Sequence, residues 1–252
     1  MRRAYPRGPA QFSLGPGMMT PAVRMLIWAN VGVFVAGAVI PPLGRLLIDV
    51  FGLRPQAVLT GLRIWQPVTY MFLHGGFSHI LFNMLVLWMF GVQLERLWGG
   101  PFFLRYFFIT GIGAGVATIG AGLLPFAFSE PTYFAVTIGA SGAIYGLLMA
   151  FAIYYPNRPI LMFLLFPVPA KYFVMIIGGI SLLSAMNGPG GGVAHTTHLG
   201  GLIVAYLYLK GGSRTRLLAE LKFHYLKWRI NQTRRRFEVH EGGRSTPIDR
   251  VH

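Results

Sequence analysis

Few side chains that could do chemistry occur in the apolar part of this sequence, and they fall into three clusters. Each cluster combines side chains that donate, accept or transfer protons with glycine or alanine at neighbouring positions. Histidine is suited to proton transfer near neutral pH, and serine becomes a good nucleophile once a neighbouring base takes its proton. The combination therefore favours acyl-transfer chemistry. The clusters are His74, His79 and Asn83 in HGGFSHILFN, the segment Gly139-Ala140-Ser141-Gly142, and His195 with His198 in AHTTHLGG.

Ser141 and His198 are the predicted nucleophile and base. An imidazole that takes the serine proton can later return it to the leaving amine. His79 and Asn83 lie four residues apart, so they share one helical face and could bind an oxyanion together with the backbone N–H of Ser141. Tyr145, one turn after Ser141, could support the imidazole ring. These residues predict a serine hydrolase site.

A carboxylate to complete a triad is not evident. Glu95 follows His79 by 16 residues, roughly 24 Å along a helix, which places it at the other end of the same element. Asp49 and Glu130 are not excluded by spacing, but neither sits in a motif. A Ser-His dyad is therefore the favoured interpretation.

The composition indicates a membrane protein. Of the 252 residues 54% are hydrophobic and only 12% are charged, about half the charged share of a soluble domain. There is no cysteine, which excludes disulfides, cysteine-ligated zinc and thiol nucleophiles. Stretches of about 20 apolar residues predict membrane-spanning helices. Six are expected, at about 22–40, 78–95, 102–124, 137–155, 168–186 and 194–210.

The segments outside these spans have distinct compositions. Residues 1–21 form a basic arm that we expect to be flexible, and residues 41–77 an interfacial loop with aromatic anchors. A signal peptide cleaved near Ala36-Gly37-Ala38 is a less favoured alternative for the first span. Residues 211–252 form a basic tail, of which 213–238 has the spacing of an amphipathic helix on anionic lipid. We therefore expect three parts: 1–21, a membrane domain at 22–210, and 211–252.

Basic residues set the expected orientation of the spans. All but three of the 22 Lys and Arg residues fall on one side of the membrane, and the three exceptions are Arg45, Arg54 and Arg63. The positive-inside rule then places both termini in the cytoplasm. Separately, we expect a multi-pass protein of a bacterial plasma membrane, although the absence of cysteine fits an organelle equally well. All three polar clusters lie at outward-facing ends of spans, so they could meet at one depth.

Small residues predict close helix contact beside the polar clusters. Gly142 with Gly146, and Gly201 with Ala205, form small-xxx-small patterns in the fourth and sixth spans. Packing these faces together would bring Ser141 beside His198.

The combined motifs resemble the rhomboid family of intramembrane serine proteases. The match covers about residues 22–210 and rests on HGGFSHILFNM, GVQLERLWGG, GASGAIYG and AHTTHLGG, in this order. The resemblance implies an all-α, six-transmembrane-helix bundle with an interfacial loop between spans one and two. It also implies transmembrane protein substrates that enter between spans two and five.

The resemblance carries roles onto single residues of this sequence. It implies a Ser141–His198 dyad, an oxyanion site of His79, Asn83 and the Ser141 amide, and Tyr145 packed on His198. Glu95 and Arg96 match the family's structural Glu-Arg pair. Ala205 departs from the glycine usual at that position, and His195 leaves a second histidine near the base. The supporting positions are Gly139, Gly142, Gly201 and His74.

Other functions fit the sequence less well. A metal site built from the histidines is an alternative, but serine and asparagine suit acyl chemistry better. Arg234 to Arg236 could suggest nucleic acid, yet beside a membrane domain we expect no nucleic-acid partner. No cofactor or metal is expected, and the oligomeric state is left open. The main rival is a catalytically inactive relative that binds transmembrane clients, against which the presence of both Ser141 and His198 argues.

Overall fold

A computed structural model describes residues 16–126, 129–162, 165–186 and 195–211. The chain divides into two compact units, Met1–Leu209 and Lys210–His252, and all the contacts below belong to the first. The Gly-rich turn 187–192 and the amphipathic segment 213–238, both interpreted from the sequence, lie outside the described residues.

The described part of the chain is mostly helical. Within it, three helices are long and apolar enough to cross a membrane: α1 (Pro21–Val39), the continuous helix Phe77–Trp98, and α7 (Gly100–Ala121). The second consists of α5 (Phe77–Val86), a π-helical turn at Leu87–Gly91 and α6 (Val92–Trp98). Gly99, with φ +79°, permits the reversal from α6 into α7.

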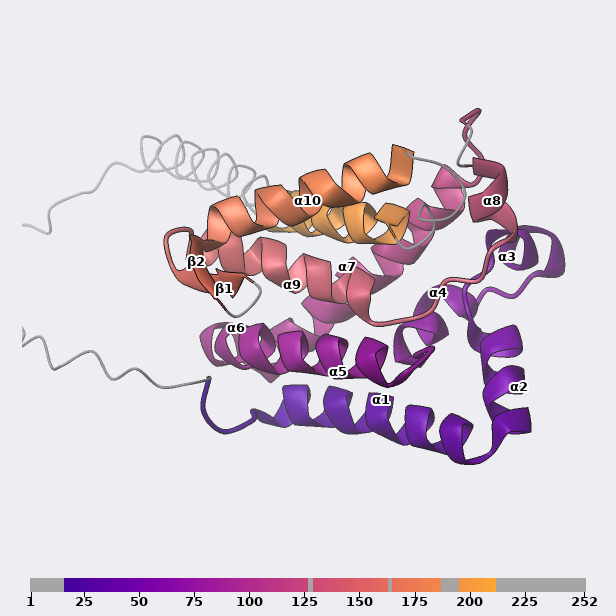
Figure 1. The fold of residues 1–252 in the computed structure, drawn as a ribbon, viewed down its shortest axis with the longest axis horizontal. Helices are drawn as coiled ribbons and strands as arrows, with labels where there is room; N and C mark the ends of the chain where they lie inside the picture. Colours follow the sequence, from indigo (N-terminus) through magenta and orange to yellow (C-terminus); the bar gives the residue numbers. More distant parts are fainter. Residues whose placement is uncertain (1–15, 127–128, 163–164, 187–194, 212–252) are drawn as a thin grey trace, which may run out of the picture. The chain divides into compact units, whose positions relative to one another are not determined.

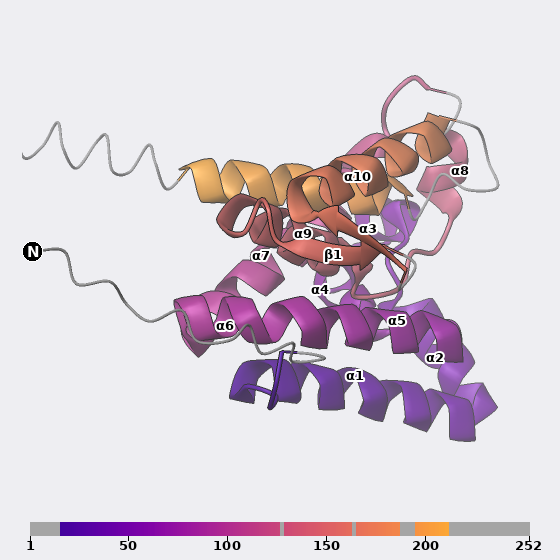
Figure 2. The same cartoon turned by 60° about the vertical axis from the view of Figure 1, so that its left-hand side comes forward.

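Shorter apolar helices follow. They are α9 (Ser141–Tyr154), α10 (Ala170–Met186) and the helical residues 195–211. In Figures 1 and 2, α1 lies along the α5–α6 helix and α9 lies on the other side of that helix. The unlabelled orange-yellow helix beside α10 in Figure 1 is 195–211. This arrangement brings the beginnings of α5, α9 and 195–211 toward one end of the bundle.

Residues 41–77, expected to form a loop, are largely helical. They contain α2 (Pro41–Phe51), α3 (Pro55–Gly61), α4 (Gln66–Thr69) and a 3-10 turn η1 (Tyr70–Phe72). Proline at the first or second position of α2, α3 and α4 explains why each helix begins there, since proline at a helix start costs no hydrogen bond.

Side chains tie this helical segment together. Trp65 donates its indole N–H to the carbonyl of Val50 (2.9 Å), and Thr69 donates its hydroxyl to the carbonyl of Phe51 (2.8 Å). The fully buried Gln66 accepts from the backbone N–H of Arg54 (3.1 Å). Trp65 thus holds the segment internally, in addition to any contact with lipid.

Two connections also carry more structure than expected. A two-stranded antiparallel hairpin, β1 (Pro159–Met162) and β2 (Phe166–Pro169), joins α9 to α10 and departs from an all-α fold. A short helix α8 (Ser129–Phe134) precedes α9, which begins at Ser141 and not near residue 137.

Glu95 and Arg96 bind the chain that enters α1. The Glu95 carboxylate accepts the backbone N–H groups of Ala22 (3.0 Å) and Val23 (2.9 Å), a favourable site for negative charge at a helix N-terminus. Arg96 donates to the carbonyls of Pro16 (2.7 Å) and Met18 (3.0 Å). Residues 16–20 of the expected flexible arm are therefore fixed on the membrane domain.

Glycines let the central helices touch. A Cβ on Gly201 would collide with the carbonyl oxygen of Gly142, so the backbones of α9 and 195–211 are in direct contact there, as the small-residue spacing predicts. Gly146 behaves differently, because its added Cβ would lie 2.7 Å from Thr110 of α7. The Gly142–Gly146 pattern thus serves two neighbouring helices rather than one.

Replacing Gly201 tests this contact. We expect Gly201→Ala to force the two backbones apart and destabilise the protein by about 1–3 kcal/mol, as overpacking does. Gly179→Ala is the matched control, because a Cβ there meets nothing within 4 Å. Thermal unfolding in detergent would show a lowered midpoint for Gly201→Ala only; equal midpoints for both variants would contradict the proposed contact.

Candidate active site

The segment before α9 is held in an extended path by the helices of residues 41–77. Leu53 and Thr137 exchange two backbone hydrogen bonds, of 2.9 and 2.7 Å. Two residues later, Gly139 donates its backbone N–H to the carbonyl of Tyr70 (2.9 Å). Gly139 has φ +120°, which favours glycine, and this conformation sets the direction in which the chain enters α9 at Ser141.

Ser141 and His198 lie within hydrogen-bonding distance. His198 Nε2 is 2.9 Å from Ser141 Oγ, although the two residues are 57 positions apart. Gly142 directly follows Ser141 and Gly201 lies one turn after His198, so the contact between these two glycines sets this distance. Thr118 Oγ1 and Thr197 Oγ1, 2.7 Å apart, fix the 195–211 helix to α7 beside it.

Tyr145 lies flat on the imidazole of His198. The ring centroids are 4.1 Å apart and the planes differ by 7°. The stacking restricts rotation of the imidazole, so Nε2 stays directed at Ser141.

Among the described residues, no carboxylate lies against the other nitrogen of His198. In the part of the chain that the structure describes, Nδ1 is buried without a hydrogen-bond partner. Glu95 is bound at the start of α1, and Asp49 forms an ion pair with Arg54 (3.7 Å). Glu130 lies on α8. The geometry around His198 is thus that of a pair, without a third acidic member among the described residues.

His79 presents a nitrogen beside Ser141. Its Nδ1 accepts the backbone N–H of Gly75 (3.4 Å), so the proton of the neutral ring resides on Nε2. A Cβ added to Gly139 would lie 2.7 Å from His79 Nε2 and 3.8 Å from Ser141 Oγ. The absence of a side chain at residue 139 therefore lets an imidazole donor approach the serine.

Asn83 is buried one turn further along α5. Its Nδ2 donates to the carbonyl of His79 (2.9 Å), a bond within its own helix. One amide hydrogen remains for another acceptor, because an asparagine amide has two. Its described contact is therefore with the backbone that carries His79, and not with Ser141.

His74 lies beside His79, and His195 lies beside His198. The described contacts of His74 and His195 do not include Ser141. His74 packs edge-on against His79, with centroids 4.9 Å apart, and burial followed by the proximity of His79 lowers the pKa of His74 to about 4. It is therefore neutral near pH 7. His195 packs edge-on against His198 at 5.9 Å. Among the described residues no group of three histidine or acidic side chains could hold a metal ion.

Comparison with known proteins identifies the family. The family model of the rhomboid domain matches residues 61–214. The chain belongs to the rhomboid family. Together with its apolar helices, this membership makes it a multi-pass membrane protein.

Several curated relatives are similar over part of their length. Rhomboid protein 1, mitochondrial, of Saccharomyces cerevisiae is 32% identical over 143 residues, which cover 54% of this chain and 38% of that protein. The rhomboid protease AarA of Providencia stuartii is 31% identical over 166 residues, covering 60% and 57%. The putative rhomboid protease YdcA of Bacillus subtilis is 29% identical over 153 residues, covering 60% and 70%. The chain thus spans less than two thirds of the first and second of these relatives.

Tyr70 is a residue of this rhomboid site that the sequence interpretation missed. It is fully buried, its carbonyl binds Gly139, and its hydroxyl donates to the carbonyl of Gly111 on α7 (2.7 Å). Tyr70 therefore ties the segment before Ser141 to the bundle. No local motif marks it, because one tyrosine among apolar residues looks like any interfacial aromatic residue.

The stacking of Tyr145 can be tested through the reactivity of Ser141. Tyr145→Ala removes the plane that holds His198, so we expect labelling of Ser141 by a fluorophosphonate to slow by about tenfold or more, the scale of misplaced reacting groups. Tyr145→Phe keeps the ring and should label at close to the wild-type rate. Equal rates for the alanine variant and wild type would show that the stacking does not position the imidazole.

Proposed function

We propose that this rhomboid-family protein is an intramembrane serine endopeptidase that hydrolyses peptide bonds in or near transmembrane segments of membrane proteins. The observation that carries the proposal is the 2.9 Å separation of Ser141 Oγ and His198 Nε2 between two helices in contact. Membership of the family, and relatives named as rhomboid proteases, support the same activity.

The dyad supplies the proton transfers that acyl transfer needs. His198 Nε2 takes the hydroxyl proton as Ser141 Oγ attacks the substrate carbonyl carbon, and the resulting imidazolium gives that proton to the leaving amine. In the second half, His198 takes a proton from a water molecule as that water attacks the acyl-enzyme ester. The imidazolium then gives the proton to Ser141 Oγ, which restores the serine hydroxyl as the acid product leaves. The stacked Tyr145 keeps the ring aligned in both halves of the reaction.

The oxyanion is assigned to donors at the start of two helices. We assign the role to the Nε2–H of His79 and to the backbone N–H of Ser141, the first residue of α9; in support, His79 Nε2 and Ser141 Oγ both lie close to the Cβ position of Gly139. Asn83 contributes its remaining amide hydrogen from the next turn of α5. Such preorganised donors stabilise the negative charge that develops on the carbonyl oxygen.

For the membrane arrangement we propose the one that the sequence predicts. The six spans are α1, the α5–α6 helix, α7, α9, α10 and 195–211, with both termini in the cytoplasm of a bacterium and the dyad near the outer surface of the plasma membrane. The membrane domain comprises residues 22–210, between the basic segments 1–21 and 211–252, of which the latter binds anionic lipid.

Substrate helices enter between α5 and α10. Both helices carry exposed apolar side chains toward their outward-facing ends: Phe77 is 72% exposed at the start of α5, and Leu183 is 63% exposed near the end of α10. These surfaces suit a transmembrane helix, which offers the same apolar contact as lipid.

Labelling and cleavage by a Ser141→Ala variant test the nucleophile. We expect wild type to react with a fluorophosphonate and to cleave a co-reconstituted single-span substrate, and Ser141→Ala to do neither while its thermal unfolding is unchanged. Equal cleavage by both proteins would refute the assignment of Ser141. Substrate binding without cleavage by wild type would instead indicate the inactive client-binding relative.

Separate alanine variants distinguish the two histidines. His198→Ala removes the general base and should lower the cleavage rate by at least about a hundredfold. His195→Ala leaves Ser141 and His198 in contact and should change the rate little. Loss of cleavage confined to His195→Ala would transfer the role of base to His195.

A further inference from the structure

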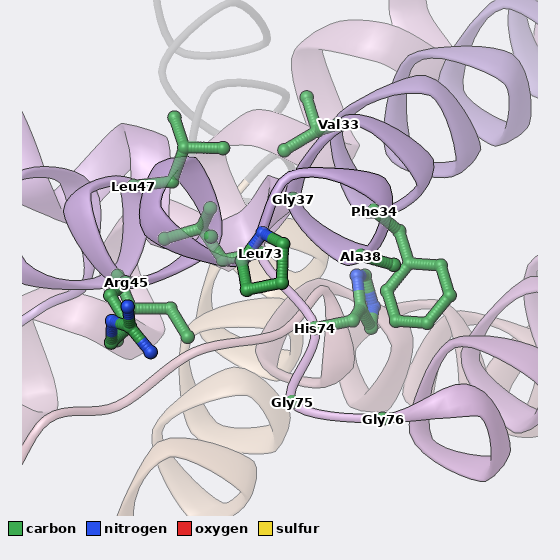
Figure 3. A pocket seen from close by; sticks show the side chains of 13 residues that line it. Val33, Phe34, Gly37, Ala38, Arg45, Leu47, Leu73, His74, Gly75 and Gly76 are labelled. Carbon is green, nitrogen blue, oxygen red and sulfur yellow. The ribbon is translucent and has the colours of Figure 1, made fainter.

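A cavity that does not include Ser141 or His198 lies between α1, α2 and residues 73–76. It has a volume of about 400 Å³ (Figure 3). The walls are mainly apolar, with Val33, Phe34 and Ala38 on α1, Leu47 on α2 and Leu73 before α5. The proposed peptidase chemistry does not use this space.

Two glycines shape the cavity where α1 meets α2. A Cβ on Gly44 would lie 2.5 Å from the carbonyl oxygen of Gly37, so the two backbones touch. Both glycines line the cavity and add no side chain to it. The space is thus built into the corner between these helices.

Arg45 gives the cavity its charge. It is the one residue of the lining that is charged near pH 7, since His74 is neutral there. In the described ranges the recorded ion pair is Arg54–Asp49, so Asp49, one turn from Arg45 on α2, is bound elsewhere. Figure 3 shows the Arg45 guanidinium and the His74 ring on opposite sides of the cavity. A ligand with an anionic group at the α2 side fits this distribution.

The cavity lies at the end of α1, which in the proposed arrangement is at a membrane surface. α2 runs across the end of α1 (Figure 1), and α1 is long and apolar enough to span a membrane. At the corner between them, Val39 is 72% exposed and Leu46 is 56% exposed, as expected for contact with acyl chains. An arginine at such a position extends its stem along apolar surface toward the headgroups.

We propose that this cavity binds one anionic phospholipid, with the phosphate held by Arg45 and one acyl chain packed along α1. A guanidinium binds phosphate through two parallel N–H···O bonds, which gives an orientation as well as affinity. The walls on Val33, Phe34 and Leu47 match a hydrocarbon chain, whereas they offer no row of backbone donors and acceptors that an extended peptide would require.

The bound lipid also touches the segment that orients His79. His74 and Gly75 line the cavity, and the same two residues contact the His79 ring and bind its Nδ1. The lipid therefore supports the oxyanion donor from behind. This consequence rests on the proposed function, whereas the binding site itself does not.

Native mass spectrometry of the full chain with phosphatidylglycerol tests the site. Besides lipid held by the basic tail, which both proteins share, we expect wild type to retain one lipid that Arg45→Gln binds about tenfold more weakly, the effect of losing a charge-assisted hydrogen bond. Arg24→Gln is the matched control, because Arg24 is also exposed on the membrane domain but lies near the other end of α1. Undiminished binding by Arg45→Gln, or equal loss in both variants, would refute the site.

Two further measurements identify the ligand and its effect. Phosphatidylglycerol with a photoreactive acyl chain should cross-link to residues 33–48, and inorganic phosphate should not displace it; displacement by phosphate would reduce the site to an anion site. Cleavage in vesicles should be faster with phosphatidylglycerol than with phosphatidylcholine alone, and should lose that gain in Arg45→Gln. An unchanged rate with intact binding would refute only the effect on His79.

Discussion

The contact between α9 and the 195–211 helix at Gly142 and Gly201 is the constraint on which the site depends. The carbonyl oxygen of Gly142 occupies the place where a Cβ of Gly201 would stand, so no other residue fits at position 201 without moving a helix. Ser141 and His198 flank this contact, and their 2.9 Å separation follows from it. Glycine in both helices replaces side-chain packing by backbone contact, which fixes the distance more tightly than flexible side chains could.

A second set of constraints lies in the segment that precedes α5. Backbone polar groups away from water must find partners, and in this segment they find them in Tyr70, Gln66, Trp65 and the Leu53–Thr137 bridge. The same bonds hold Gly139 in its left-handed conformation next to His79. A region that looks like a connecting loop thus determines how the chain presents Ser141.

His198 and His79 are oriented without a carboxylate partner among the described residues. Packing against a ring orients the first, and a backbone hydrogen bond orients the second. His198 has an unpartnered Nδ1 among the described contacts, and its orientation comes from the ring of Tyr145. His79 obtains a defined tautomer from a single backbone N–H of Gly75. In a site enclosed by apolar helices, such arrangements avoid burying a carboxylate, which would be costly in an apolar environment.

The sequence by itself determined the membrane class, the approximate positions of the apolar helices and the membership of Ser141, His198, His79 and Tyr145 in one neighbourhood. These features could be predicted because apolar stretches, helical spacing and small-residue patterns depend on residues that are close together in the sequence. It did not determine that residues 41–77 fold into helices, that a hairpin joins α9 to α10, or that Gly146 faces α7. Nor did it reveal Tyr70 or the cavity beside Arg45. Only the tertiary structure decided these, because each depends on which distant backbone group supplies a hydrogen bond or leaves a space.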